Sequence, residues 1–175
     1  MATTSEEIQG QATDPREQYL EALDREFATT LRVLRSFPPD QLDLRPSPRS
    51  KTARELAWIF AQERGLGLRV MTTGLDMSGG APPPIPETMD EIIVRTEEAN
   101  RRLVEHIRSL PQDKLFAPVK FFVAPRTLGD IPLLQFAWFL LSDEIHHRGQ
   151  FSVYVRIAGG KLPSIYGPTA DEPWF

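Results

Sequence analysis

The sequence contains no cysteine, and this excludes disulfides, thiolate metal ligands and a cysteine nucleophile. Long apolar runs are also missing. The longest, from Ile131 to Leu141, is interrupted by Pro132 and Gln135 and is far shorter than the roughly 20 residues that span a bilayer. The polar first 13 residues contain no apolar core of a signal peptide. We therefore expect a cytoplasmic protein that does not enter a membrane.

No stretch of the chain concentrates charge of one sign. The formal net charge is −4, and the basic residues are interleaved with acidic ones. A nucleic-acid-binding surface needs clustered lysine and arginine, so no nucleic-acid partner is expected. The length of 175 residues suits one domain with a proper core. We expect a flexible tail at residues 1–13 and a single domain at residues 14–175.

Four segments show the 3.6-residue apolar periodicity of amphipathic helices, and proline-rich joints separate them. They are expected at about residues 14–36, 52–73, 88–109 and 130–158. Thr52 with Glu55, and Thr88 with Glu91, form capping boxes that begin the second and third segments. Pro132 is compatible with the first turn of the fourth. Strand signal is weak and is confined to a short irregular or extended stretch at 116–123.

The connections complete the expected fold. Gly74 to Pro86 is rich in glycine and proline and predicts a long crossover loop, and the tail after Gly160 predicts an irregular cover over one end. The fold class is therefore expected to be all-α, a four-helix bundle with a long crossover and an irregular C-terminal tail. Sites in such bundles are formed by side chains of facing helices.

The octapeptide Asp143–Gln150 carries the main candidate site. Asp143 and His147 lie four residues apart within an apolar helical stripe, so both can face one metal ion or one substrate. Buried ionisable groups cost free energy unless they are paired, hydrogen-bonded or ligated. His146 lies about 100° round the helix and is expected at the bundle edge. Gly149 is expected to allow a close approach of another backbone.

Two longer strings carry a resemblance to a known family. They are SPRSKTARELAWIFAQE at 47–63 and DEIHHRGQFSVYVRIAGGKLPSIYGP at 143–168, followed by TADE at 169–172. The chain resembles the DinB/YfiT-like superfamily of bacterial four-helix bundles, whose members are described as metalloenzymes. The resemblance implies a bundle fold, a homodimer and one divalent metal ion held by three histidines, one on the second helix and an H-x-x-x-H pair on the fourth.

This chain departs from the implied ligand set. The matching positions are Ile59, Asp143 and His147, so only His147 keeps the family residue. Isoleucine cannot ligate a metal, and Asp143 replaces a neutral nitrogen ligand with a charged oxygen. Glu63 lies one turn beyond Ile59 on the same helical face. Glu63, Asp143 and His147 would then form a one-histidine, two-carboxylate site.

That site would hold one divalent ion, Mn²⁺, Fe²⁺, Ni²⁺ or Zn²⁺. Its carboxylates favour harder ions such as Mn²⁺, Fe²⁺ or Mg²⁺ over Zn²⁺ bound by nitrogen or sulfur.

Three hypotheses of function follow. In the first, the metal site is degenerate, Asp143 and His147 satisfy each other, and the protein is metal-free or binds metal weakly, with a buried small-molecule pocket. In the second, Glu63, Asp143 and His147 hold a metal for a thiol S-transferase or isomerase that acts with a low-molecular-weight thiol, as the resemblance implies. In the third, Asp143 and His147 form a metal-free acid–base dyad. Trp138 and Phe139 would supply contacts in a homodimer.

Overall fold

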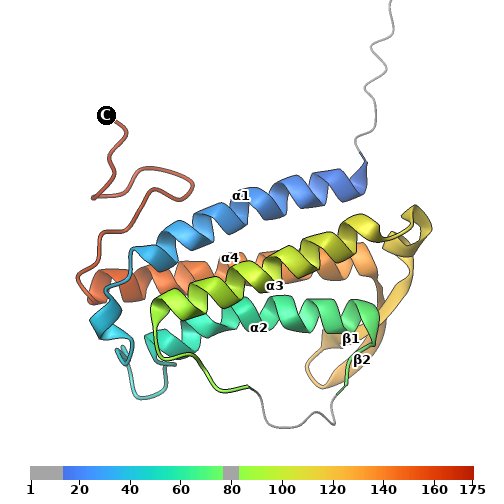
Figure 1. The fold of residues 1–175 in the computed structure, drawn as a ribbon, viewed down its shortest axis with the longest axis horizontal. Coiled ribbons are helices and arrows are strands. Elements are labelled where there is room, and N and C mark those ends of the chain that lie inside the picture. Colours follow the sequence, from blue (N-terminus) through green and yellow to red (C-terminus); the bar gives the residue numbers. More distant parts are fainter. Residues whose placement is uncertain (1–13, 77–82) are drawn as a thin grey trace, which may run out of the picture.

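The computed structural model describes residues 14–76 and 83–175. Four helices dominate it (Figure 1): α1 (Pro15–Arg35), α2 (Ala53–Thr72), α3 (Met89–Ser109) and α4 (Leu133–Ile157). The connections contain two short 3-10 helices, η1 (Pro39–Gln41) and η2 (Gln112–Phe116), and two strands, β1 (Pro118–Ala124) and β2 (Thr127–Pro132). The tail predicted at residues 1–13 and the centre of the crossover lie outside the described residues.

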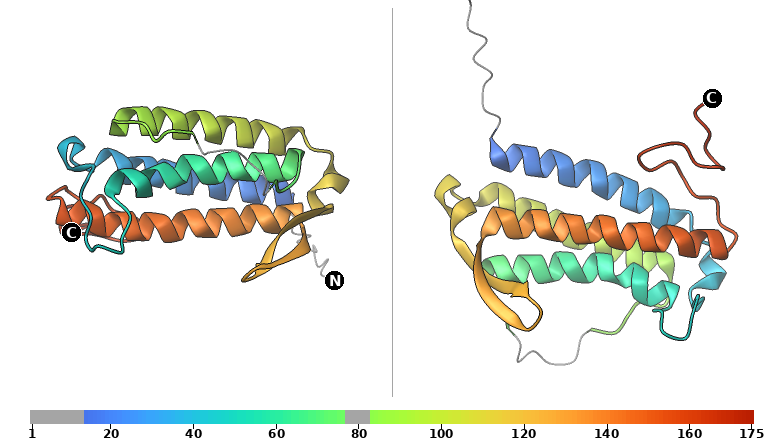
Figure 2. Two further views of the ribbon diagram at one scale, coloured as in Figure 1. Left: turned by 90° about the horizontal axis from the view of Figure 1, so that it is seen from below. Right: turned by 180° about the vertical axis from the view of Figure 1, so that it is seen from behind.

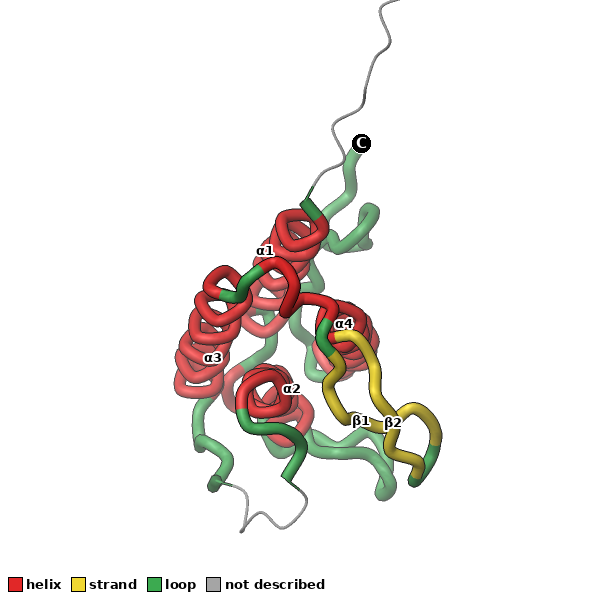
Figure 3. The backbone as a smooth tube through the Cα atoms, turned by 90° about the vertical axis from the view of Figure 1, so that its right-hand side faces the viewer, coloured by secondary structure: helices red, strands yellow, loops and turns green. Residues whose placement is uncertain are grey.

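The helices form a bundle in which α1 and α2 each lie against both α3 and α4. Viewed from one end, the four helices occupy the corners of the bundle (Figure 3). The neighbours α2 and α3 run in the same direction, whereas α4 runs antiparallel to both (Figure 1). Two parallel neighbours cannot be joined by a tight turn, so the chain must return along the bundle before α3 begins. The parallel orientation of α2 and α3 therefore accounts for the long crossover that the sequence predicts.

The capping boxes form as the sequence predicts. At the start of α2, the Glu55 amide donates to Thr52 Oγ1 at 3.1 Å, and Glu55 Oε2 accepts from the Thr52 amide at 2.7 Å. At the start of α3, the Glu91 amide donates to Thr88 Oγ1 at 3.2 Å, and the Thr88 amide donates back at 3.3 Å. These bonds satisfy amides that have no partner within the helix, so they determine where each helix begins.

A β-hairpin corrects the expectation of an all-α fold. Strands β1 and β2 pair antiparallel, with Pro118 opposite Pro132. Phe121 of β1 is 8% exposed and packs its ring 4.8 Å from that of Phe136 on α4, centroid to centroid. The hairpin therefore covers one end of the bundle, opposite the C-terminal tail (Figure 2).

The start of the fourth helix is also corrected. It begins at Leu133, whereas the sequence predicted a start near Asp130. The ring of Pro132 disfavours the helical conformation at Ile131, which keeps that residue extended. The chain consequently stays in strand β2 up to the proline, and the helix can begin only after it.

The core contains three apolar clusters. The smallest joins the β-hairpin to α2 and α4, and a polar layer separates the two larger ones. One cluster lies at the end of the bundle that carries the α1–α2 loop and includes Leu34, Phe60, Ile92 and Phe151. The other lies toward the opposite end and includes Leu23, Leu103, Leu134 and Leu141. Along each helix, buried polar residues separate the members of one cluster from those of the other: Thr30, Arg64, Thr96, Glu144 and Arg148.

The segment after α4 is irregular, as predicted, and side chains hold it to the bundle. Arg32 of α1 donates to the Ser164 carbonyl at 2.8 Å, and Arg156 of α4 forms an ion pair with Asp171. None of the described helices is both long enough and apolar enough to cross a membrane.

Candidate metal centre and adjoining pocket

Facing positions of α2 and α4 bring Glu63, Asp143 and His147 together, as the sequence predicted. One donor atom from each residue lies within 4.8 Å of the other two. His147 Nε2 is 3.1 Å from Glu63 Oε1 and 3.7 Å from Asp143 Oδ1. The side chains of Glu63 and His147 are 12% and 19% exposed, and that of Asp143 is 37% exposed. The cluster is therefore largely shielded but open to solvent on the Asp143 side.

The Glu63 carboxyl carries the strongest electrostatic perturbation in this cluster. The pKa of Glu63 is raised to about 9, first by burial and then by the negative charge of Asp143 and a hydrogen bond with it, while Arg64 opposes them. The carboxyl is accordingly protonated at neutral pH. Its Oε2 is buried and has no hydrogen-bond partner within the described part of the chain. A cation at this point would take the place of the proton and balance both acidic groups.

Gln150 orients the imidazole of His147. His147 Nδ1 lies 3.1 Å from Gln150 Oε1, an atom that can only accept, so the imidazole donates from Nδ1. In neutral His147 the lone pair is then on Nε2, the atom that faces the two carboxyl groups. Metal-ligating histidines are typically held in this way by a partner on the other ring nitrogen. The sequence places Gln150 three residues after His147, and that i, i+3 spacing is the signal for this role.

A cavity of about 500 Å³ adjoins His147. Its walls come from the end of the α1–α2 loop, the first turn of α2 and the second half of α4: Ser50, Lys51, Leu56, His147, Gln150, Val153 and Tyr154. Several of these residues are exposed, so the cavity lies at the surface, whereas the sequence predicted a pocket buried in the bundle. The interior cavity next to Glu63 measures only about 10 Å³, about the space that one water molecule needs.

Behind the cluster, a buried ion pair crosses the core. Arg64 Nη2 lies 2.7 Å from Glu144 Oε2, and both side chains are 3% exposed. The Thr30 hydroxyl donates to Glu144 Oε1 at 2.7 Å, and Arg64 Nε donates to Asn100 Oδ1 at 3.0 Å. All four helices thus contribute to one network. Arg64 and Glu144 immediately follow the candidate ligands Glu63 and Asp143 in sequence, so consecutive residues of α2 and α4 face the site and the core.

Arg148 extends this network to the C-terminal tail. It is 1% exposed and donates through Nη2 to Glu26 Oε2 and to the Tyr166 hydroxyl, both at 2.6 Å. The Tyr166 hydroxyl in turn donates to Glu26 Oε2 at 2.7 Å. The sequence prediction did not include these buried charges. The sequence signal for their burial is their spacing. Leu141, Glu144, Arg148 and Phe151 follow one another at intervals of three, four and three residues, which places them on one helical face.

Comparison with known proteins agrees with this architecture. The sequence profile of the DinB family matches residues 9–173. The chain belongs to the DinB family. A DinB-like protein from Bacillus cereus ATCC 10987 superposes with a TM-score of 0.69 at 24% identity, over 86% of this chain and 97% of that one. The DinB-like protein YjoA of Bacillus subtilis gives a TM-score of 0.65 at 18% identity, over 84% and 96%.

One similar sequence is the uncharacterised protein YrdA of Bacillus subtilis strain 168, which is 25% identical over 157 residues. The match covers 88% of this chain and 89% of YrdA. The resemblance stated from the sequence motifs is therefore confirmed at the level of family and fold.

The donor set of this DinB-family protein fits a divalent ion, although the three-histidine set is not available. Ile59 offers no donor atom and packs against the apolar core. Donors around one ion with bonds of about 2.1 Å are separated by about 3–4 Å. The donor atoms lie within 4.8 Å of one another, so a contraction of about 1 Å would bring them to this range. Two carboxylates and one imidazole suit Mn²⁺ or Fe²⁺ and leave coordination positions for other ligands.

The remaining candidates from the sequence do not join this site. His146 is exposed, and its Nε2 lies 2.9 Å from the amide nitrogen of Gln150 on its own helix. His106 lies on α3, and its buried Nε2 has no partner in the described regions. The close approach expected at Gly149 is wrong, because a Cβ there would meet nothing within 4 Å. A Cβ at Gly67 of α2, in contrast, would lie 2.6 Å from Leu140 Cδ1.

Proposed function

We propose that this DinB-family protein binds one divalent cation through Glu63, Asp143 and His147 and acts on a small molecule held in the adjoining cavity. The observation that carries the proposal is the Glu63 carboxyl. It lies against a second carboxyl and an imidazole, its pKa is raised to about 9, and its Oε2 is buried without a hydrogen-bond partner among residues 14–76 and 83–175. A bound cation would stabilise the ionised form of this carboxyl and so favour the loss of its proton.

Each residue has a distinct role in this proposal. Glu63 and Asp143 supply the negative charge, and His147 supplies a neutral nitrogen donor whose orientation depends on Gln150. A bound ion would act as a Lewis acid that polarises a thiol, water or carbonyl ligand. A low-molecular-weight thiol is the substrate class implied by the resemblance to the superfamily. Because His147 also lines the cavity, a molecule held there lies next to the candidate ligands.

Metal content tests the proposal directly. Protein purified without an affinity tag is incubated with Mn²⁺, Fe²⁺, Ni²⁺ or Zn²⁺, desalted and analysed for bound metal. We expect about one equivalent, which is lost in His147→Ala and retained in the matched control His106→Ala. If no ion binds under any condition, or if His147→Ala retains the metal, the proposal is wrong.

A metal-free pocket protein is the second candidate, and the hydrogen bonding within the cluster supports it. A protonated Glu63 can donate a hydrogen bond to Asp143 or to Nε2 of His147, so the three groups can satisfy one another without an ion. Under this alternative the metal titration shows no uptake. Replacing Glu63 by glutamine would then leave binding in the cavity unchanged, because the site contains no charge that the substitution removes.

We also propose that the protein is a homodimer. Exposed apolar side chains gather at the hairpin and the first half of α4: Phe122, Leu128, Trp138 and Phe139 are 39–48% exposed. Size-exclusion chromatography with light scattering should give a dimer that Phe139→Glu converts to a monomer. Val94→Glu on α3 is the matched control, because Val94 is an exposed apolar residue on a different helix. A monomeric wild-type protein would contradict this proposal.

A further inference from the structure

The cavity beside His147 is electrostatically asymmetric. One end is formed by His147, which is next to the acidic groups of Glu63 and Asp143. Lys51, at the end of the α1–α2 loop, is among the residues that form the rest of the wall. Over the described residues, no ion pair is found for the Lys51 ammonium group. Lys51 does help to lower the pKa of Glu55, but that carboxylate is already held first by the Thr52 backbone and also by other groups.

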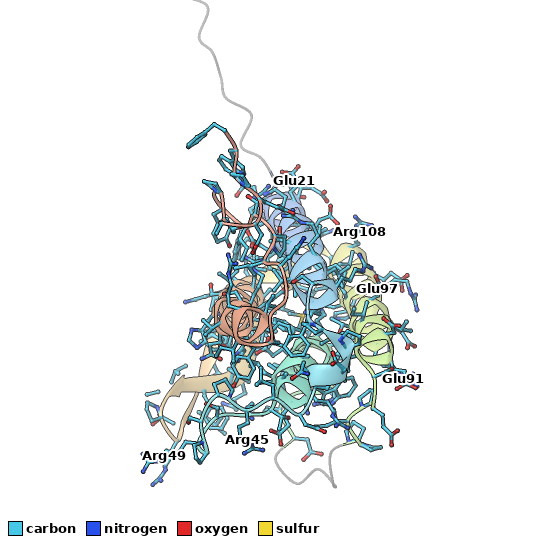
Figure 4. The ribbon with its side chains drawn as sticks, turned by 90° about the vertical axis from the view of Figure 1, so that its left-hand side faces the viewer. Glu21, Arg45, Arg49, Glu91, Glu97 and Arg108 are labelled. Carbon is cyan, nitrogen blue, oxygen red and sulfur yellow. The ribbon has the colours of Figure 1, made fainter. Side chains whose placement is uncertain are left out.

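The loop that carries Lys51 is basic although the protein is acidic. Within seven residues, the string RPSPRSK contains three cations, whereas the whole chain has a net charge of −4. Arg49 projects away from the bundle (Figure 4), Arg45 lies 3.5 Å from Glu55 of α2 and is paired with it, and Lys51 lines the cavity. Arg49 therefore adds positive potential near the loop without filling the cavity.

Hydrogen bonds hold the backbone at Lys51 in place. The Tyr154 hydroxyl on α4 donates to the Lys51 carbonyl at 2.9 Å, and the next residue, Thr52, closes the capping box of α2. The peptide group that follows Lys51 is consequently held at both its carbonyl and its amide. A preorganised backbone lowers the entropic cost of placing a charged group on a ligand.

We infer that this cavity binds a small organic anion whose anionic group lies at Lys51. Leu56, Val153 and the ring of Tyr154 offer an apolar surface to the rest of the molecule. The volume of about 500 Å³ lies within the usual range for small-molecule sites. This anion site extends the proposed function, and only the reaction depends on that function. The part of the anion farthest from its charged group would face His147. Binding of the anion needs no metal.

Two fluorescent probes that differ in charge test the inference. The first is the sulfonate anion 8-anilino-1-naphthalenesulfonate, and the second is its uncharged relative N-phenyl-1-naphthylamine, both titrated in EDTA. We expect one equivalent of the sulfonate to bind, and Lys51→Glu to weaken it by about tenfold, as for the loss of a hydrogen bond to a charged group. The affinity for the neutral probe should change by less than about twofold.

Two further variants locate the site. Lys114→Glu makes the same charge change on η2 at the opposite end of the bundle (Figure 1) and should leave both affinities unchanged. Val153→Trp should fill the cavity and weaken both probes. The inference is overturned if the wild-type protein does not bind the sulfonate, if Lys114→Glu weakens it as much as Lys51→Glu, or if Val153→Trp changes nothing.

Metal titration keeps this test separate from that of the proposed function. Lys51→Glu should bind Mn²⁺ as the wild type does, because Lys51 is not a candidate ligand. Wild-type protein that binds the sulfonate through Lys51 but takes up no metal would refute the metal site and leave the anion site standing. Metal uptake without binding of the sulfonate would refute the anion site and leave the metal site standing.

Discussion

Replacing Glu63 by glutamine should change how the stability of the metal-free protein depends on pH. The pKa of Glu63 is raised from 4.5 to about 9 in the folded protein. As pH rises, the unfolded chain loses this proton first, whereas the folded chain keeps it. The stability due to protonated Glu63 is therefore complete below pH 4.5 and is lost progressively as pH rises toward 9.

The expected magnitude follows from proton linkage. A group that is protonated only in the folded state lowers the free energy of unfolding by about 1.4 kcal/mol for each unit of pH. Between pH 5.5 and 7.5 the loss is about 2–3 kcal/mol. Glu63→Gln cannot ionise and so lacks this term. Because the other groups titrate in both proteins, the difference between the two free energies isolates the contribution of Glu63.

Urea unfolding at pH 5.5, 6.5 and 7.5 in EDTA measures this difference. Relative to the wild type, Glu63→Gln should gain about 2–3 kcal/mol over the range. With saturating Mn²⁺ the wild type should instead gain stability as pH rises, because the ion competes with the proton for the carboxylate. Parallel pH curves for the two proteins in EDTA would refute the reasoning, since Glu63 would then ionise alike in the folded and unfolded states.

Further substitutions test the packing, the core ion pair and a helix cap. Gly67→Ala and Gly149→Ala both replace a helical glycine by a better helix former, which by itself stabilises a helix by about 0.5–1 kcal/mol. Gly149→Ala has free space and should show this gain, whereas the new methyl group in Gly67→Ala meets the side chain of Leu140 at a cost of about 1–3 kcal/mol and should lower the midpoint of thermal unfolding relative to Gly149→Ala. Equal effects would contradict the packing argument. Glu144→Gln should cost about 3–5 kcal/mol in urea unfolding because it leaves Arg64 buried without its partner, and adding Arg64→Met should recover most of the loss. Thr52→Ala should cost about 1 kcal/mol through the lost cap, measured by the same urea titration, and no change would argue against the capping box.

The helix boundaries could be predicted where the signal is local. The capping boxes at Thr52 and Thr88 depend on bonds between residues three apart, so the sequence alone is sufficient to recognise them. The extended stretch predicted at 116–123 covers most of strand β1, but its partner β2 was missed because the proline that precedes α4 also ends β2. Pro132 is compatible with the first turn of a helix and with the end of a strand. Only the packing of Phe121 against α4 decides between the two.

The sequence identifies more of the residues of the candidate site than of the buried charged residues behind it. Asp143 and His147 share a helical face by spacing alone, and Glu63 lies one turn from Ile59, where the resemblance to the family implies a ligand position. Glu144 and Arg148 were missed because α4 buries two stripes, one toward α1 and one toward α2. Charged residues in the second stripe look solvent-exposed when only the apolar stripe is followed. Their partners lie on other helices, and the sequence does not show which helices adjoin.

The network around Arg148 has a consequence for the order in which the chain can complete its fold during synthesis. Glu26 is made before Arg148, and Tyr166, which bonds to both, is made only after the whole of α4. The guanidinium therefore lacks its complete set of partners until the segment that follows α4 has also left the ribosome. Collapse of the apolar clusters can begin earlier, but the bundle can bury this charge without penalty only after that segment has been made.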